Sequence, residues 1–237
     1  MTRAGASGDP GSTWAVLVAA GSGERLGADR PKAFVALGER VLLAESIERL
    51  DASPWIDAIV VAVPAGWEEA AIVLAEELVV SKVTAVVTGG ATRAASVRAA
   101  LDEVPDTALV VLVHDAARPL VDDGVIERLL APLAEGYDGA VPALPVPDTV
   151  KRVERGVVVE TVDRAGLVLA QTPQAFPATV LRAAYAGDLD DLTDCSSLVE
   201  RRGGRVRVVE GDTRLLKITT AADLALVASW LDGPRTP

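Results

Sequence analysis

Cysteine and histidine are nearly absent from this chain of 237 residues. The one cysteine, Cys195, has no second thiol in the chain with which to form a disulfide. The one histidine, His114, cannot supply a zinc site that is built on several imidazoles, and we expect it to be a hydrogen-bonded residue at a strand end. An internal disulfide and a histidine-based zinc site are therefore excluded.

The chain also lacks an excess of positive charge and a long apolar run. Its net charge is -11 and its pI about 4.6, whereas a general nucleic-acid surface needs clustered excess cations. No apolar run reaches the ~18 residues of a membrane span, so no membrane segment is expected. Residues 1–13 are rich in Gly, Ser and Pro without an apolar signal core, which predicts a disordered tail and a cytoplasmic protein.

Aromatic residues make up only 3% of the chain, although 50% of its residues are hydrophobic, so Val, Leu, Ile and Ala must fill the core. Strand-length apolar runs alternate with helix-like patterns. Strands are expected at 14–19, 56–63, 83–87, 108–113 and 205–209, and helices at 42–50, 67–78, 93–101, 177–186, 193–202 and 221–230. This alternation predicts one α/β domain over 14–231, with a mostly parallel sheet flanked by helices and a short C-terminal tail at 232–237.

The most informative segment is AAGSGERLG at 19–27, which follows the first apolar run and precedes a short loop to Lys32. Gly21 and Gly23 allow the backbone to approach phosphate oxygens, and successive N–H groups in such a turn form an anion-binding concavity. Arg25 and Lys32, one of only four lysines in the chain, add positive charge. We therefore predict that this segment holds a nucleoside triphosphate.

Spacing excludes two common phosphate-binding motifs. A Walker A loop requires Lys and then Ser or Thr directly after its second glycine, and here Glu24 and Arg25 follow Gly23. A Rossmann dinucleotide motif requires a small residue three positions after the second glycine, where this chain has Leu26. The segment therefore belongs to a different class of nucleotide-binding loop.

Two further predicted strands end in residues that suit a ligand site. Gly89 and Gly90 follow the third strand, and His114 and Asp115 follow the fourth. Ligands of parallel sheets bind beyond the carboxyl ends of the strands. We therefore expect these residues to lie beside the glycine-rich segment at one edge of the sheet.

Residues 142–171 interrupt the alternation. Runs of β-forming residues at 150–153 and 157–162 flank a turn at Gly156, which predicts a protruding hairpin, or arm, over about 143–170. An isolated two-stranded ribbon is only marginally stable in water. We therefore expect the arm to pack on a second copy of the chain, forming a homodimer.

Taken in order, these motifs resemble those of the 2-C-methyl-D-erythritol 4-phosphate cytidylyltransferases. The resemblance covers 14–230 and rests on AAGSGER (19–25), PK (31–32), GG (89–90) with Arg93 and Ser96, HDAARP (114–119), DT (148–149), VDR (162–164), QTPQ (171–174), TD (193–194) and KIT (217–219). It implies a Rossmann-like nucleotidyltransferase fold and transfer of CMP from CTP to methylerythritol 4-phosphate. The products are 4-diphosphocytidyl-2-C-methyl-D-erythritol and pyrophosphate, in the non-mevalonate route to isoprenoid precursors. The chain departs from the family at Ala91, where many members have Asp.

The resemblance also implies residue roles in a reaction that depends chiefly on positioning and electrostatics. It assigns Arg25 and Lys32 to the triphosphate and the charge that develops at the α-phosphorus, and Arg164 and Lys217 to the attacking phosphate. Residues expected to contact CTP are Ala20, Gly21, Ser22, Gly23, Gly89, Gly90, Ser96 and Asp115. Residues expected to contact the sugar phosphate are Arg118, Thr149, Arg164, Thr172 and Thr193.

A Mg²⁺ ion or another divalent cation that bridges the CTP phosphates is implied as well. Asp115 is the nearest candidate carboxylate ligand, with contact to the ribose as the alternative role. Because Thr149 and Arg164 fall on the predicted arm, the resemblance implies that they complete the site of the neighbouring subunit.

Three other functions compete with this interpretation. A cytidylyltransferase for another polyol phosphate, such as ribitol 5-phosphate, shares the glycine-rich loop and much of the segment around Asp115. A sugar 1-phosphate nucleotidyltransferase is expected to lack the arm. A catalytically silent nucleotide-binding module is disfavoured, because it would not need both Lys32 and Lys217.

Overall fold

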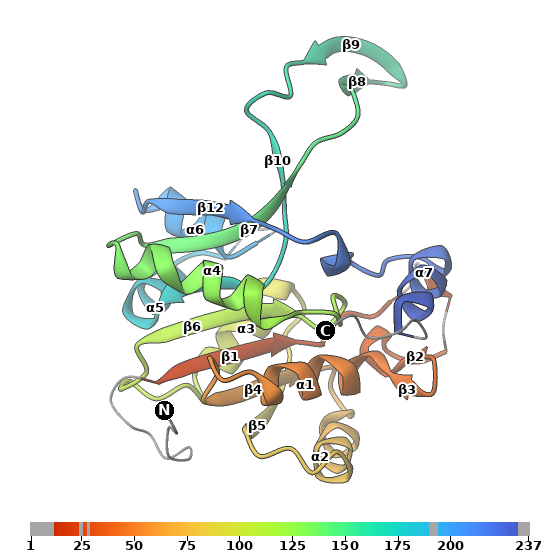
Figure 1. Ribbon diagram of the computed structural model, residues 1–237, viewed down its shortest axis with the longest axis vertical. Coiled ribbons are helices and arrows are strands. Elements are labelled where there is room, and N and C mark those ends of the chain that lie inside the picture. The colour runs from red at the N-terminus through yellow and green to blue at the C-terminus, as the bar shows by residue number, and fades with distance from the viewer. Residues whose placement is uncertain (1–11, 24–25, 28, 190–193, 232–237) are drawn as a thin grey trace.

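The computed structural model describes residues 12–23, 26–27, 29–189 and 194–231. In these ranges an eight-stranded sheet lies between helices on both of its faces (Figure 1). The strands of the sheet are β1 (Thr13–Val18), β4 (Ala58–Val63), β5 (Val83–Thr88), β6 (Val110–Asp115), β7 (Gly139–Pro145), β10 (Val168–Ala170), β11 (Gln174–Pro177) and β12 (Val206–Glu210). The predicted α/β class is confirmed.

Most strand pairs in the sheet are parallel. The order is β10-β7-β11-β6-β1-β4-β5, with β12 paired to β7. Strand β1 pairs in parallel with β4 and β6, β4 with β5, and β12 with β7. The exceptions are β11, which runs antiparallel to β6 and β7, and β10, which runs antiparallel to β7. The prediction of a mostly parallel sheet is confirmed, and the antiparallel β11 at its centre is a feature that the apolar pattern did not indicate.

Successive side chains of a strand point to opposite faces of the sheet, and both faces are buried here. In β1, Ala15 and Leu17 face one hydrophobic cluster, whereas Trp14 and Val16 face another. The first cluster is covered by α1 (Leu42–Ala52), α2 (Glu68–Glu77) and α4 (Asp123–Ala134), and the second by α3 (Arg93–Leu101), α5 (Ala178–Tyr185) and α6 (Ser196–Arg201). This double burial explains why the strands are continuous apolar runs of Val, Leu, Ile and Ala.

A third, smaller cluster fixes the C-terminal part of the chain. The 3-10 helices η2 (Lys32–Phe34) and η3 (Thr213–Leu215) contribute Phe34 and Leu215 to the first cluster. The third cluster instead joins β2 (Ala36–Leu37), which pairs with β3 (Arg40–Val41), to α7 (Ala221–Leu231). Ile218 is fully buried in it, and its backbone N–H donates to Ala117 O at 2.8 Å. The neighbouring Lys217 is thereby held next to the carboxyl end of β6.

The arm is a separate two-stranded sheet of β8 (Val150–Glu154) and β9 (Val157–Val162), which stands away from the rest of the domain in Figure 1. Arg155 and Gly156 both have positive φ values, 49° and 82°, as a two-residue hairpin turn of type I′ requires. Val153, Val157, Val158 and Val159 are each at least half exposed. The predicted protruding hairpin is confirmed, and it presents apolar side chains without a covering layer.

The structure agrees with some predicted elements and differs from others. Helix α3 has the predicted bounds, whereas the sequence pattern did not predict helix α4. Ser12 and Thr13, placed in the tail by sequence, are buried, and Thr13 N donates to Asp57 Oδ2 at 2.8 Å, so the sheet begins earlier than expected. The remainder of the predicted tails, 1–11 and 232–237, lies outside the described residues. Among the described helices, none combines the length and apolar content that a bilayer span requires.

Candidate active site

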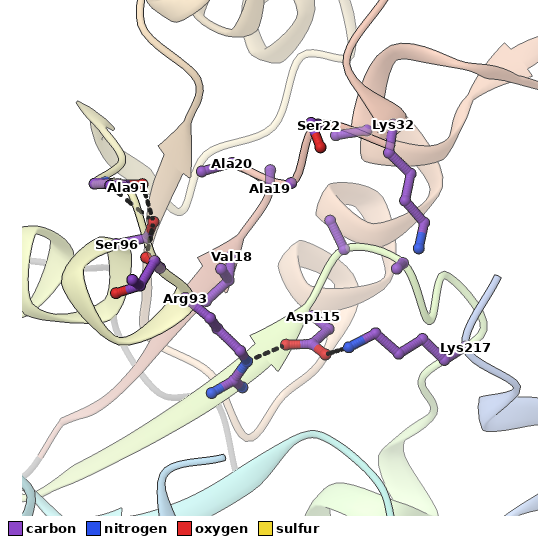
Figure 2. Close-up of a pocket in the computed structure, with 16 residues that line it drawn as sticks. Val18, Ala19, Ala20, Ser22, Lys32, Ala91, Arg93, Ser96, Asp115 and Lys217 are labelled. Carbon is purple, nitrogen blue, oxygen red and sulfur yellow. Dashed lines mark hydrogen bonds and ion pairs between the residues drawn. The ribbon is translucent and has the colours of Figure 1, made fainter. Parts of the chain in front are cut away.

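A pocket of about 600 Å³ opens at the carboxyl ends of β1, β5 and β6. Figure 2 shows the side chains that surround it. They come from three strand-end segments and two further segments of the chain: Val18–Ser22, Gly90–Arg93 with Ser96, Asp115–Ala117, Lys32–Ala33 and Lys217. The predicted convergence of three strand ends on one edge of the sheet is therefore confirmed.

The glycine-rich loop forms one wall of the pocket and fixes Lys32. A Cβ atom at Gly21 would have open space around it. Gly23 differs, because its φ is +75° and a Cβ there would lie 2.8 Å from Lys32 Cβ. Lys32 N also donates to Gly21 O at 3.4 Å. Glycine at position 23 thus allows the chain to approach Lys32 closely, and the Lys32 side chain extends from this loop toward the end of β6 (Figure 2).

The turn between β5 and α3 forms the opposite wall. A Cβ atom at Gly89 would lie 2.4 Å from Ala20 Cβ, and one at Gly90 2.4 Å from Ala95 Cβ, so larger residues cannot fit without movement. Ser96 is buried, and its Oγ accepts from Gly90 N at 3.1 Å and donates to Thr92 O at 3.0 Å. These residues make a closely packed turn, in which Gly89 lies against Ala20 at the start of the glycine-rich segment.

Asp115 connects two cations at the base of the pocket. Its Oδ1 accepts from Arg93 Nε at 2.8 Å and its Oδ2 from Lys217 Nζ at 2.7 Å, as the dashed lines in Figure 2 mark. Burial alone raises the pKa of Asp115, but the charges of Arg93 and Lys217 outweigh burial and hold this pKa well below its usual range. The carboxylate is therefore ionised and held by ion pairs on both sides.

A hydrogen-bonded chain behind Asp115 fixes its backbone. Asp115 N donates to Thr172 Oγ1 at 3.0 Å, and Thr172 Oγ1 lies 3.2 Å from His114 Nδ1. His114 Nε2 lies 3.0 Å from Arg118 O, which can only accept, so we assign the proton to Nε2 and the acceptor role to Nδ1. Burial lowers the pKa of His114 to about 4, which keeps the imidazole neutral at neutral pH. His114 thus has the hydrogen-bonded position expected from sequence.

Two predicted substrate-binding residues make contacts within the protein instead of lining the pocket. The one hydroxyl proton of Thr172 faces His114, which leaves none for a phosphate oxygen. The Arg118 guanidinium donates to Leu215 O at 2.5 Å and to Ala170 O at 3.5 Å. Arg118 therefore links the segment before Lys217 to the base of the arm. A direct contact of either side chain with substrate stays a prediction.

The residues present do not fit a metal ion coordinated directly by the protein. Asp115 is the sole carboxylate among the described lining residues, and each of its oxygens already accepts from a cation. No group of three or more His, Cys, Asp or Glu side chains suited to a metal occurs in the described part of the chain. A divalent cation placed at Asp115 would meet the positive charges of Arg93 and Lys217. The structure thus provides no support for the expected ligand role of Asp115.

The arm residues lie away from the pocket of their own chain. Thr149 is exposed, and Arg164 donates to the backbone oxygens of Val146 and Pro147 at the base of the arm. Neither residue lines the pocket. Two other predicted residues, Arg25 and Thr193, lie outside the described residues.

Arg93 is a charged residue of the site that was not among the site residues predicted from the sequence. It occupies the first position of α3, lines the pocket and binds Asp115. Its place shortly after the glycine pair, at the start of a predicted helix, was the available signal. Predicted residues that do line the pocket are Ala20, Gly21, Ser22, Lys32, Gly90, Ser96, Asp115 and Lys217.

Comparison with known proteins places the whole chain in one family. The sequence profile described as 2-C-methyl-D-erythritol 4-phosphate cytidylyltransferase matches residues 13–232. The chain belongs to this family. The family name describes a cytidylyltransferase that acts on 2-C-methyl-D-erythritol 4-phosphate, so the fold and the enzyme class expected from the sequence motifs are both confirmed.

Relatives of the same name align over nearly their full lengths. The 2-C-methyl-D-erythritol 4-phosphate cytidylyltransferase of Nocardia farcinica is 48% identical over 223 residues, 94% of this chain and 95% of the relative. That of Saccharopolyspora erythraea is 47% identical over 225 residues, 93% and 99% of the two chains. The crystal structure of the Thermus thermophilus enzyme of this name superposes with a TM-score of 0.75 at 34% identity, over 92% of this chain and 98% of that one. The match to the family profile, over residues 13–232, therefore includes the arm and the segments that line the pocket.

Proposed function

We propose that this pocket transfers the cytidylyl group of CTP to 2-C-methyl-D-erythritol 4-phosphate. An oxygen of the sugar phosphate attacks the α-phosphorus of CTP, the bond from that phosphorus to the oxygen bridging to the β-phosphate breaks, and pyrophosphate leaves. Both reactants are strongly anionic, so local positive charge must offset their repulsion. The observation that carries the proposal is that Lys32, Arg93 and Lys217 line one pocket in a chain whose net charge is -11.

The cations divide between the two reactants according to their place around the pocket. Lys32 stands beside the glycine-rich loop, where backbone N–H groups suit the CTP phosphates, and we assign it to the triphosphate together with Arg25. Lys217 enters from the C-terminal segment and suits the attacking phosphate. Gly90 and Ala91 line the wall on the α3 side and have no long side chain to obstruct a flat base, so we assign cytosine to this wall.

We propose that a divalent cation, where the reaction uses one, is held by the CTP phosphates. Magnesium commonly keeps several waters and binds substrate phosphates with only one or two protein carboxylates. Asp115, whose oxygens are ion-paired, serves as the anchor for Arg93 and Lys217. The steps derived for this chain therefore need no metal-ligating side chain.

We further propose that the arm joins two chains into a homodimer and delivers Thr149 and Arg164 to the partner's pocket. Four valines of the ribbon are each at least half exposed. Because successive residues of β9 point to opposite faces, they leave apolar side chains on both faces of a ribbon that stands away from its own domain and needs a partner. Arg164 is held at the base of this ribbon, outside its own pocket. A second copy is the occupant that would supply both the apolar cover and a phosphate for Arg164.

The proposed reaction is tested by substrate choice. The purified chain with CTP and a divalent cation should release pyrophosphate with methylerythritol 4-phosphate, and ribitol 5-phosphate should react at least ~100-fold more slowly as judged by kcat/KM. Faster turnover of ribitol 5-phosphate would favour the other cytidylyltransferase. Nucleotide binding without turnover of either substrate would favour a silent module.

Mixing of variants tests the role of Arg164 across the dimer. Arg164→Ala and Lys32→Ala should each be nearly inactive, but after exchange of subunits the 1:1 mixture should recover about a quarter of wild-type activity, because half of the dimers then hold one intact site. Arg152→Ala, which removes an exposed arginine of the same arm, should remain fully active by itself. If Arg164 served its own pocket, or if the chain were a monomer, the mixture would stay as inactive as its parts.

A further inference from the structure

Arg93 is held on two sides by side chains of the protein, a carboxylate and a buried thiol. Its Nε donates to Asp115, and on the side away from the pocket its Nη1 donates to Cys195 Sγ at 3.4 Å. Cys195 is fully buried, and its Sγ lies 3.1 Å from the Tyr185 hydroxyl. The Cys195 backbone N–H donates in turn to Gln174 Oε1 at 3.1 Å. A connected set of buried groups from α5, β11 and the start of α6 therefore supports one guanidinium.

The sulfur supports Arg93 without cancelling its charge. Burial raises the pKa of the Cys195 thiol, although the nearby Arg93 acts in the opposite direction, so the thiol is neutral at neutral pH. Asp115, the carboxylate that pairs with Arg93, is shared with Lys217, whereas Asp194 at the far end of the set accepts from Gln174 Nε2 at 2.9 Å. Arg93 and Lys217 thus flank one negative charge, and these three side chains together carry a net positive charge beside the pocket.

Packing alone does not require an arginine at this position. Arg93 Nη2 is buried and has no hydrogen-bond partner among the described residues. A buried donor without a partner costs about 1–3 kcal/mol. A methionine would fill a similar volume without that cost, and what it would lack is the charge beside Asp115. The arginine at this position therefore serves the Asp115 carboxylate at the edge of the pocket.

We propose that Arg93 is a positioning residue of the transfer reaction: it orients the Asp115 carboxylate, which then holds the Lys217 ammonium in place for the attacking phosphate. The proposal rests on the function proposed above. Lys217 has a long, half-exposed side chain, and Asp115 is its ion-pair partner in the structure. Without Arg93, the Asp115 carboxylate would be free to rotate together with the Lys217 ammonium that it binds. Displacement of a positioned group by about 1 Å can reduce a rate 100-fold.

Steady-state release of pyrophosphate by Arg93→Met, Arg93→Lys and the wild type tests the proposal. Arg93→Met should lower kcat about 30-fold while KM for CTP changes less than about threefold, because the lost effect concerns the reacting geometry and not uniform binding. Arg93→Lys, which keeps a charge near Asp115, should recover most of the loss. Arg98→Met, on an exposed position of the same helix, should match the wild type. A raised KM for CTP with unchanged kcat would overturn the proposal, since Arg93 would then bind CTP directly.

A double-mutant cycle separates positioning from a general structural effect. If Arg93 acts through Lys217, the double variant Arg93→Met/Lys217→Met should be no slower than Lys217→Met alone, whereas independent contributions would multiply. Multiplied losses would overturn the proposal. If Arg93→Met does not fold, Arg93→Gln, which also removes the charge beside Asp115, takes its place in the same cycle. An inactive wild type would instead refute the proposed function.

A spectroscopic measurement observes Lys217 directly and requires no turnover. The chain contains only four lysines, so reductive ¹³C-methylation gives few signals, and loss of a signal in Lys217→Arg assigns it. In the wild type, the chemical shift of the Lys217 methyl signal should differ from that of a free lysine. In Arg93→Met it should move to the free-lysine value, while the Lys82 signal keeps its chemical shift. An unchanged Lys217 signal in Arg93→Met would show that Arg93 does not position this lysine.

Discussion

Replacement of Lys32 by alanine is expected to lower kcat for pyrophosphate release at least ~100-fold, the range seen when one transition-state contact is removed. Lys32 lines the pocket, and the close approach of Gly23 holds its backbone against the loop assigned to the triphosphate. Charge that accumulates on the oxygens around the α-phosphorus would lose the lysine assigned to it. KM for the sugar phosphate should change much less, because that substrate is assigned to Lys217.

Matched variants show whether the loss comes from the position of the charge. Lys82→Ala removes a lysine whose Nζ donates to Ser53 O at 2.6 Å, before the start of β5 and away from the pocket, and should have wild-type rates. Lys32→Arg keeps the charge but replaces a compact ammonium by a planar fork, so partial activity is expected. Equal rates for Lys32→Ala and the wild type would refute the assignment of Lys32.

Gly23→Ala should also lower the activity, although it changes no charge. The added Cβ would lie 2.8 Å from Lys32 Cβ, and φ at this position is +75°, which side chains rarely adopt. The loop must shift to accommodate it and would move Lys32. We expect a loss of kcat about tenfold, smaller than for Lys32→Ala because the charge remains. Gly27→Ala, where φ is +63° but a Cβ has open space, separates the effect on Lys32 from backbone strain.

Features set by local signals could be predicted from the sequence. Helix α3 has the predicted bounds because the glycine pair stops β5 and the Thr92 side chain caps the helix by accepting from Ala95 N at 3.1 Å. The strands that carry the pocket are long apolar runs buried on both faces, which is the clearest pattern a parallel sheet provides. The edge at which the site lies then follows from strand direction.

Features set by distant contacts could not be predicted in this way. Strand β11 has four residues, and its place between β6 and β7 depends on pairing with strands from other parts of the chain. Asp115 was recognised as a site residue, but its ion pairs join it to residues 22 and 102 positions away. No periodic pattern encodes such pairs. The hydrogen bonds of Thr172 and Arg118 to acceptors within the protein could not be predicted for the same reason.

Replacement of Asp115 by asparagine should have an effect on both activity and stability. The amide has one acceptor oxygen, so its NH₂ group must face either Arg93 Nε or Lys217 Nζ, each of which is a donor. Arg93 and Lys217 would then lie near each other without the negative charge between them that offsets their repulsion. We expect kcat to fall about 100- to 1000-fold and the free energy of unfolding to fall by about 3 kcal/mol, as when one partner of a buried ion pair is removed.

Two measurements distinguish this anchoring role of Asp115 from the role of a metal ligand. Thermal unfolding without substrate and in the presence of EDTA should already reveal the loss of stability, because both ion pairs lie within the protein. Raising the Mg²⁺ concentration should not restore the activity of Asp115→Asn. Glu45→Gln, which breaks the partly buried pair of Glu45 with Arg49 on α1, should cost only about 0.5 kcal/mol and no activity. Recovery of the wild-type rate at high Mg²⁺, with wild-type stability in EDTA, would instead establish Asp115 as a ligand of the metal.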